Sequence, residues 1–121
     1  MSVAVNLLAL DRHVAEAGRA AFLITVSAEG TPHVVSASVI SAKGGLALRV
    51  GRHSRANLAA HPCVTLLWPA APGGDYSLLV DGRVDTLPDA DGGAVTVIPG
   101  SAVWHRVADA AGSGPTCLPV E

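Results

Sequence analysis

Basic and polar side chains gather in one short segment, between residues 49 and 57. It contains three of the eight Lys and Arg residues, and its candidate anion-binding side chains are Arg49, Arg52, His53, Ser54, Arg55 and Asn57. A guanidinium group can bind phosphate through two parallel hydrogen bonds, and the backbone N–H groups at the start of a helix add further donors. The segment therefore predicts a phosphate site. A set of solvated loop charges is the alternative that the residues alone leave open.

The segment His33–Ser38 consists of small, uncharged side chains apart from its histidine. Such a strand would let a flat ring lie against its backbone, whose N–H and C=O groups could bind the ring edge. An ordinary barrel strand is the alternative, because most strands serve packing. His33 itself is interpreted as a surface residue of that strand. Three aromatic residues could wall a ligand, cover a dimer interface or serve the structure: Trp68, Tyr76 and Trp104.

The composition limits the possible functions. With 121 residues, of which 50% are apolar, the chain is predicted to form one domain over residues 1–121. A net charge of −2 and few aromatic residues argue against general binding to nucleic acid or to an anionic membrane. The sequence contains no motif typical of hydrolases, kinases or zinc proteases. Consequently no catalytic residue is assigned and no metal site is predicted.

The two cysteines, Cys63 and Cys117, are far apart and suggest neither a metal site nor a disulfide framework. We therefore expect a reduced, cytoplasmic setting. The first residues carry Asn6, Asp11 and Arg12 in place of a basic region followed by a long apolar run. Neither a signal peptide nor a membrane span is expected.

The elements that must position these residues are predicted from periodicity and turn signals. Apolar residues at helical spacing predict an amphipathic helix over Val3–Ala17, ended by Gly18. A shorter helix is predicted from a Ser54 cap to Ala60, because Pro62 prevents its continuation. Apolar and β-branched runs predict six strands: Phe22–Ser27, His33–Ile40, Leu46–Val50, Val64–Trp68, Tyr76–Val84 and Ala94–Ile98.

Short strands separated by turns, with two helices, favour a closed antiparallel barrel over a parallel sheet. Gly82 inside a predicted strand indicates a bulge or bend. A turn is expected over Pro88–Gly93 and a last short element over Ala102–Val107. A barrel of this size with exposed aromatic residues has apolar surface to cover, which predicts a dimer.

Three stretches of the chain resemble the flavin-binding split barrel of the pyridoxamine 5′-phosphate oxidase-like family. Phe22–Val26 with Gly30–Ser36 resembles the opening hairpin, whose second strand borders the isoalloxazine ring. Val50–Leu58, followed by His61–Leu66, resembles the phosphate-binding turn, helix and next strand, and Leu78–Val84 resembles the strand that closes the barrel. The resemblance covers about half of the chain. It implies a mainly β, six-stranded antiparallel split β-barrel with an N-terminal helix and a short inserted helix.

The resemblance also implies which residues would bind a cofactor. The phosphate would lie against Arg52, His53, Ser54 and Arg55, with Asn57 bracing the turn. Backbone contacts to the ring would come from Val34, Val35 and Ser36. The ribityl chain would be flanked by Arg49, Val50 and Gly51. Because family members bind two cofactors at a two-fold dimer interface, two residues would approach from a second protomer: Trp68 and Ser77.

The chain departs from the family in two places. The basic lysine-type phosphate ligand is replaced by His53–Ser54, with Arg55 shifted. The C-terminal segment with which pyridoxamine-phosphate oxidases hold their substrate is not recognisable, so vitamin B6 oxidation is not predicted. Family members use FMN, a 5-deazaflavin or occasionally haem. FMN is the expected cofactor because it has a single phosphate, and a deazaflavin coenzyme of the F-420 type is the alternative.

These observations predict an FMN-binding oxidoreductase that transfers a hydride to or from an unknown small substrate. We expect it to act as a homodimer without nucleic-acid or membrane partners. The alternatives are a deazaflavin-dependent reductase, a non-catalytic FMN carrier or sensor, and a barrel that has lost its cofactor and serves only dimerisation.

Overall fold

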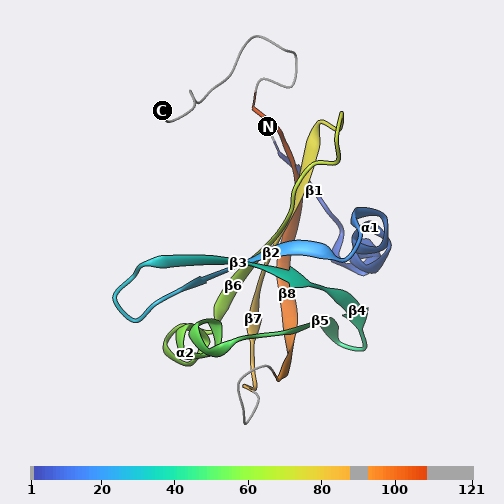
Figure 1. The fold of residues 1–121 in the computed structure, drawn as a ribbon. Helices are drawn as coiled ribbons and strands as arrows, with labels where there is room; N and C mark the ends of the chain where they lie inside the picture. Colours follow the sequence, from blue (N-terminus) through green and yellow to red (C-terminus); the bar gives the residue numbers. More distant parts are fainter. Residues whose placement is uncertain (1, 88–92, 109–121) are drawn as a thin grey trace, which may run out of the picture.

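The computed structural model describes residues 2–87 and 93–108, which form one antiparallel sheet with two helices at its outside (Figure 1). In chain order the elements are β1 (Ser2–Ala4), the 3₁₀ helix η1 (Leu7–Ala9), α1 (Leu10–Ala17), β2 (Ala20–Val26), β3 (Pro32–Ser38), β4 (Ile40–Ala42), β5 (Gly45–Arg49), α2 (Arg52–Ala60), β6 (Cys63–Trp68), β7 (Tyr76–Val84) and β8 (Ala94–Arg106). Most of the turn predicted over Pro88–Gly93, and Cys117, lie outside the described residues.

The sheet curls because its two end strands are consecutive in the chain. Its hydrogen-bonded order is β3-β2-β6-β7-β8-β5-β4, with β1 paired to β8 outside this path. Only Val39 separates β3 from β4; its side chain is 1% exposed, and its N–H donates to the Arg19 carbonyl at 2.8 Å. At this corner the chain leaves β2 and pairs with β5 instead, which joins the two ends of the path.

This mainly β, curled antiparallel sheet is compatible with the predicted split barrel, but the strand count differs. The path has seven strands in place of six, because the strand predicted over His33–Ile40 is divided at the Val39 corner. Sequence periodicity does not reveal the division, since both halves are extended. The change of pairing partner, from β2 to β5, depends on strands that are distant in the chain.

The predicted helix over Val3–Ala17 is wrong in its first part. The first residues form β1, which lies antiparallel to β8. The Asn6 side chain then accepts a hydrogen bond from the Leu8 N–H at 3.0 Å and caps η1, so that α1 begins only at Leu10. The predicted end is confirmed, because Gly18 follows α1 with a φ of 94°, a conformation that favours glycine.

Two predicted elements, Ala94–Ile98 and Ala102–Val107, belong to one strand, β8, of 13 residues. Pro99 lies opposite Gly82, at a shift in the register between β7 and β8. A proline cannot donate to the ladder and is tolerated at such a bulge, where Gly100 is the additional residue. The bulge predicted at Gly82 is therefore confirmed, and it also explains how β8 continues through a proline.

The N-cap of the short helix α2 lies three residues earlier than predicted. Gly51 is its N-cap and makes no side-chain capping bond, whereas Ser54 lies in the first turn with 3% exposure. The predicted Ser54 cap is therefore wrong, while the end at Ala60, before Pro62, is confirmed. Within the described residues, no helix has the length and apolar content needed to cross a membrane.

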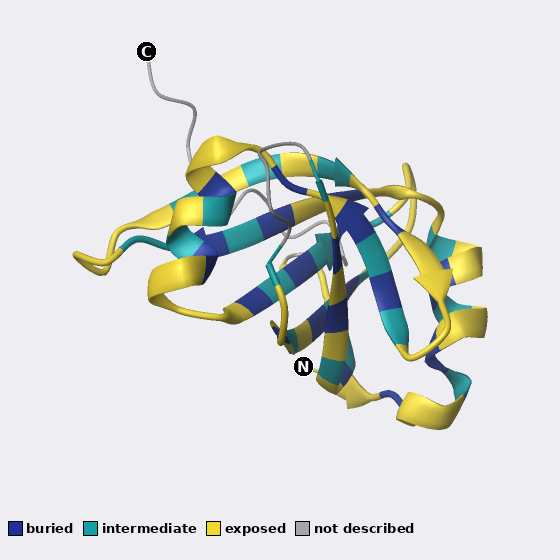
Figure 2. Ribbon diagram, turned by 90° about the horizontal axis from the view of Figure 1, so that it is seen from below, coloured by how far each residue is buried: buried dark blue, intermediate teal, exposed yellow. Residues whose placement is uncertain are grey.

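Side chains alternate between the inside and the outside along the strands, and Figure 2 shows this as alternating buried and exposed residues. The largest fully buried side chains include Trp68, Leu23, Leu66 and Leu78. The Trp68 Nε1 donates to the Gly18 carbonyl at 2.9 Å. This hydrogen bond ties the end of α1 to the barrel core.

Candidate functional site

A pocket of about 260 Å³ lies where β3, the end of β5 and the start of α2 meet. We call it the arginine pocket; it is lined by Leu23, His33, Val35, Ser36, Arg49, Val50, Gly51, Arg52, His53 and Ser54. Two arginines and two histidines belong to this lining, and no carboxylate does. The charge of the lining therefore favours an anion.

The turn between β5 and α2 positions the basic side chains. β5 ends at Arg49, and α2 begins three residues later at Arg52. The Arg55 N–H donates to the Gly51 carbonyl at 2.9 Å and closes the first turn of α2. The N–H groups before Arg55 are those that a helix leaves without an intrahelical acceptor, so an anion bound here would meet backbone donors as well as guanidinium groups.

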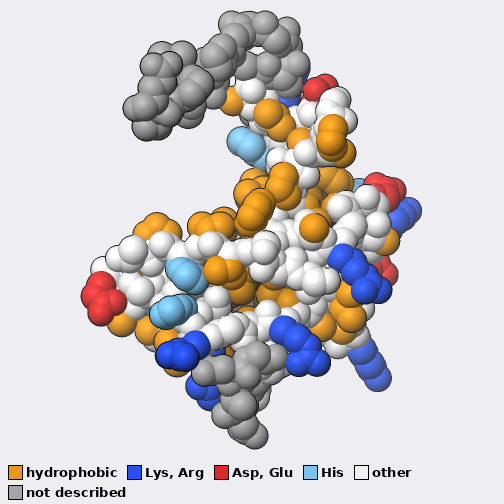
Figure 3. Space-filling view, viewed as in Figure 1, with side chains coloured by type: hydrophobic (Ala, Val, Ile, Leu, Met, Phe, Trp, Pro, Cys, Tyr) orange, Lys and Arg blue, Asp and Glu red, His pale blue; other side chains and the backbone are white. Residues whose placement is uncertain are grey.

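The structure brings together most of the residues predicted from the sequence. Val35 and Ser36 of β3 line the same pocket as the whole segment Arg49–Ser54, although the two parts are separated in the chain. Figure 3 shows histidine side chains with Lys or Arg side chains beside them at the lower left, over the region of β3 and α2, and further Lys and Arg side chains toward β5 and β4. The predicted ring-binding strand and the predicted phosphate loop are thus neighbours in space.

Three predicted residues lie beside the arginine pocket and not in its lining. Val34 is 56% exposed and lies on the opposite face of β3 from Val35, because side chains alternate along a strand. Arg55 is half-buried at the end of the first turn of α2. Asn57 donates from Nδ2 to the Oγ1 of Thr25 at 3.0 Å, and Thr25 is fully buried. This last bond fastens α2 to β2.

Trp68 and Ser77 lie away from the arginine pocket of their own protomer. Trp68 is 1% exposed and belongs to the core. Ser77 is half-buried, and its hydroxyl accepts a hydrogen bond from the Ala70 N–H at 3.1 Å. Both side chains thus have structural partners within the chain, and the burial of Trp68 gives no support to a contact with a second protomer.

His33 lines the pocket although the sequence placed it on the surface of an ordinary strand. Its ring lies beside that of His53, with centroids 5.8 Å apart and the ring planes tilted by 59°. The contact between β3 and α2 that creates this pair has no signal in the sequence. No group of three or more His, Cys, Asp and Glu residues suited to a metal ion is found in the described residues.

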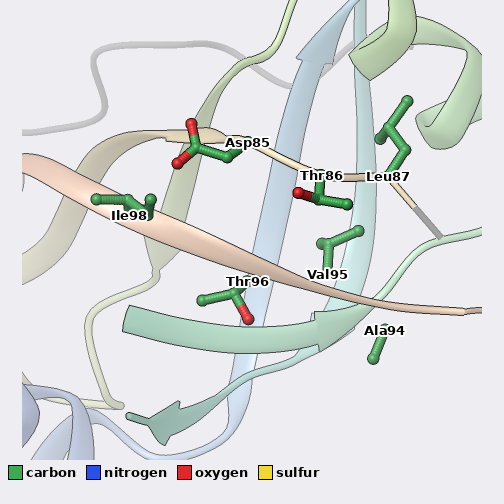
Figure 4. Close-up of a pocket in the computed structure, with 7 residues that line it drawn as sticks. All are labelled: Asp85, Thr86, Leu87, Ala94, Val95, Thr96 and Ile98. Atoms are coloured by element: carbon green, nitrogen blue, oxygen red, sulfur yellow. The ribbon is translucent and has the colours of Figure 1, made fainter. Parts of the chain in front are cut away.

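A second pocket, of about 480 Å³, lies between the segment after β7 and the first part of β8 (Figure 4). We call it the Asp85 pocket; it is lined by Asp85, Thr86, Leu87, Ala94, Val95, Thr96 and Ile98. Its lining carries one carboxylate, two hydroxyls and no basic side chain. None of the predicted site residues belongs to it. The arginine pocket is therefore the better candidate for a phosphate-bearing ligand.

Several solved structures share this fold. The haem storage protein HutZ of Vibrio cholerae superposes with a TM-score of 0.64 at 15% identity, over 80% of this chain and 94% of that chain. A FAD-binding protein of Mesorhizobium loti superposes with a TM-score of 0.63 at 18% identity, over 86% of this chain and 95% of that chain. An F420 reductase superposes with a TM-score of 0.56 at 18% identity, over 69% of this chain and 87% of that chain. At these identities the similarity demonstrates a common fold.

Sequence relatives are found in mycobacteria. An uncharacterised protein of Mycobacterium bovis and one of Mycobacterium tuberculosis are each 46% identical to this chain over 70 residues. The matched part is 55% of this chain and 48% of each relative, so the match spans about half the length of these relatives. No protein-family model matches the sequence.

Proposed function

We propose that this chain binds a flavin and that the phosphate of FMN lies in the arginine pocket. The observation that carries the proposal is that β3 and the β5–α2 turn line one pocket. Arg49, Arg52 and the first turn of α2 supply donors of the kind that bind a phosphate dianion. The FAD-binding protein of Mesorhizobium loti and the F420 reductase, which share the fold, support a flavin as the ligand class.

The size of the arginine pocket bears on how much of the cofactor it would hold. Its volume of about 260 Å³ is below the roughly 300–1,000 Å³ of sites that enclose a whole small ligand. The pocket would therefore take the phosphate and the adjoining ribityl chain, and the ring would extend along β3. FMN fits with its single terminal phosphate. A deazaflavin of the F-420 type is the second candidate, supported by the F420 reductase of the same fold.

A second copy of the chain would cover the ring. On the outer face of the sheet, four apolar side chains from neighbouring strands lie in one cross-strand row: Phe22, Leu67, Leu79 and Val103. Phe22 is 39% exposed and lies opposite Ser36, which lines the arginine pocket. Apolar surface next to a ligand site suits a symmetric interface, so we propose a homodimer with the cofactors at its interface.

The chemistry of the proposed enzyme would come from the flavin, which accepts or donates a hydride when bound. The chain would bind the phosphate, orient the ring along β3 and exclude water by dimerisation. The substrate would be a small molecule, and the protein would act in the cytoplasm, as its cysteine content suggests. A flavin carrier or sensor would use the same site without turnover.

Titration of the purified protein with FMN, F420 and riboflavin, followed by fluorescence, tests this function. We expect micromolar or tighter binding of FMN, and reduction of the bound flavin by a nicotinamide or deazaflavin donor. Tight FMN binding without turnover with any donor would favour the carrier or sensor. Absence of binding to all three flavins would reject the proposal and favour a barrel that serves only dimerisation.

A further inference from the structure

The two histidines of the arginine pocket form a pair, of which only His53 has so far been given a contact with the cofactor. His33 comes from β3 and His53 from the first turn of α2, and their ring centroids are 5.8 Å apart. Both rings border the space that Arg49 and Arg52 line. A ligand atom in that space would therefore meet two imidazoles from two different elements.

One buried residue, Thr25, contacts both elements that carry this pair. Thr25 lies directly opposite His33 in the pairing of β2 with β3. Its Oγ1 also accepts a hydrogen bond from the Nδ2 of Asn57 at 3.0 Å. Asn57 stands four positions after His53 in α2, so the two residues lie on the same face of the helix. Because Thr25 is fully buried, this link between the strand that carries His33 and the helix that carries His53 belongs to the core.

The surroundings decide between a cation and an anion as the ligand of this pair. Two imidazoles could ligate a transition metal, but the lining holds two guanidinium groups and no carboxylate to balance a metal charge. An imidazole N–H is also a good donor to a phosphate oxygen. The electrostatics of the pocket therefore favour an anion that accepts hydrogen bonds from arginine and histidine together.

We propose that His33 is a further phosphate-binding residue and that, with His53, it makes the arginine pocket selective for a terminal phosphate monoester. This inference rests on the proposed function, which it deepens by naming the chemical class recognised. A terminal monoester exposes three oxygens and carries close to two charges. It can therefore use donors from β3 and from α2 at once with an oxygen to spare, whereas a diester keeps only two such oxygens and one charge and should bind the same donors more weakly.

The test compares ligands with and without the monoester in matched variants. Dissociation constants of FMN, riboflavin and inorganic phosphate are measured by calorimetry for the wild type, His33→Ala, His33→Gln and His105→Ala. We expect His33→Ala to weaken FMN and phosphate about tenfold each, the loss of one hydrogen bond to a charged group, and to leave riboflavin unchanged. His33→Gln keeps a side-chain N–H donor and should recover part of the affinity. His105→Ala, at an exposed residue of β8 outside the pocket lining, should leave the three dissociation constants unchanged.

The outcomes separate this inference from the proposed function. Wild-type FMN binding that His33→Ala and His33→Gln leave unchanged overturns the inference and keeps the flavin proposal. Phosphate binding that depends on His33, without binding of any flavin, keeps the inference and rejects the flavin. No binding of either ligand rejects both. If Zn²⁺ strengthens FMN binding only when His33 is present and a chelator reverses this, the pair is a metal site and the inference is overturned.

Discussion

The arginine pocket and the Asp85 pocket differ in ways that volume does not capture. The Asp85 pocket is larger, at about 480 Å³ against about 260 Å³, yet its lining comes only from β8 and the residues after β7. The arginine pocket joins three strands and the start of a helix, and it concentrates basic groups. The comparison teaches that the charge of a lining and the space it encloses vary independently, so volume by itself does not identify a candidate anion site.

Removing the guanidinium groups of the arginine pocket should have the largest effect on FMN affinity. We expect Arg49→Ala combined with Arg52→Ala to weaken FMN binding about 1,000-fold, because two charged hydrogen bonds of roughly 1.5–3 kcal/mol each are lost together. Fluorescence titration measures the affinity. The matched control in the other pocket is Asp85→Ala with Thr96→Ala, which should bind FMN as the wild type does. Equal losses in the two double variants would remove the distinction between the pockets.

The apolar row beside the arginine pocket is a second feature to test. Phe22→Asp places a charge at the end of the apolar row that lies next to the arginine pocket, and it should raise the dimer dissociation constant about 30-fold, the effect of a strong interface residue. Analytical ultracentrifugation measures this. Leu8→Asp is the control, since Leu8 is 92% exposed on η1, outside the proposed interface. A wild type that stays monomeric at high concentration would contradict the dimer.

The β7–β8 bulge near the Asp85 pocket should matter for folding and not for binding. A Cβ at Gly82 would lie 2.6 Å from the Ile98 carbonyl oxygen, so Gly82→Ala should lower the free energy of unfolding by about 2 kcal/mol. Urea denaturation gives this value. At Gly100 the nearest atom would be the Asp81 carbonyl oxygen at 3.7 Å, which makes Gly100→Ala a suitable control. Folded Gly82→Ala should keep the FMN affinity, and a large loss would link the two regions.

The smallest expected effect concerns the bond that fastens α2 to β2. Asn57→Ala leaves the buried Thr25 hydroxyl without its partner and should cost about 1 kcal/mol of stability. Because α2 carries part of the arginine pocket, FMN affinity should also fall a few-fold. Adding Thr25→Val removes the unpaired hydroxyl and should restore stability while leaving the binding defect. Recovery of both properties would show that the bond has no part in positioning α2.

Local patterns in the sequence determined the elements that depend on neighbours in the chain. Tyr76–Val84 forms a strand with the predicted limits. α1 ends before Gly18, whose φ is 94°, and α2 ends two residues before Pro62. The clustering of basic residues at the start of α2 was also readable, because it lies within one segment. These features follow from side-chain alternation, turn chemistry and backbone restrictions, which act over a few residues.

Tertiary structure alone decided the remaining features. The pairing of β1 with β8, the corner at Val39 and the continuation of β8 through Pro99 depend on partners distant in the chain. The meeting of His33 with His53 is of the same kind. Hydrogen bonds between strands and packing between layers are made with residues that local periodicity does not identify, so the sequence indicated a phosphate loop while the fold supplied the second wall of its pocket.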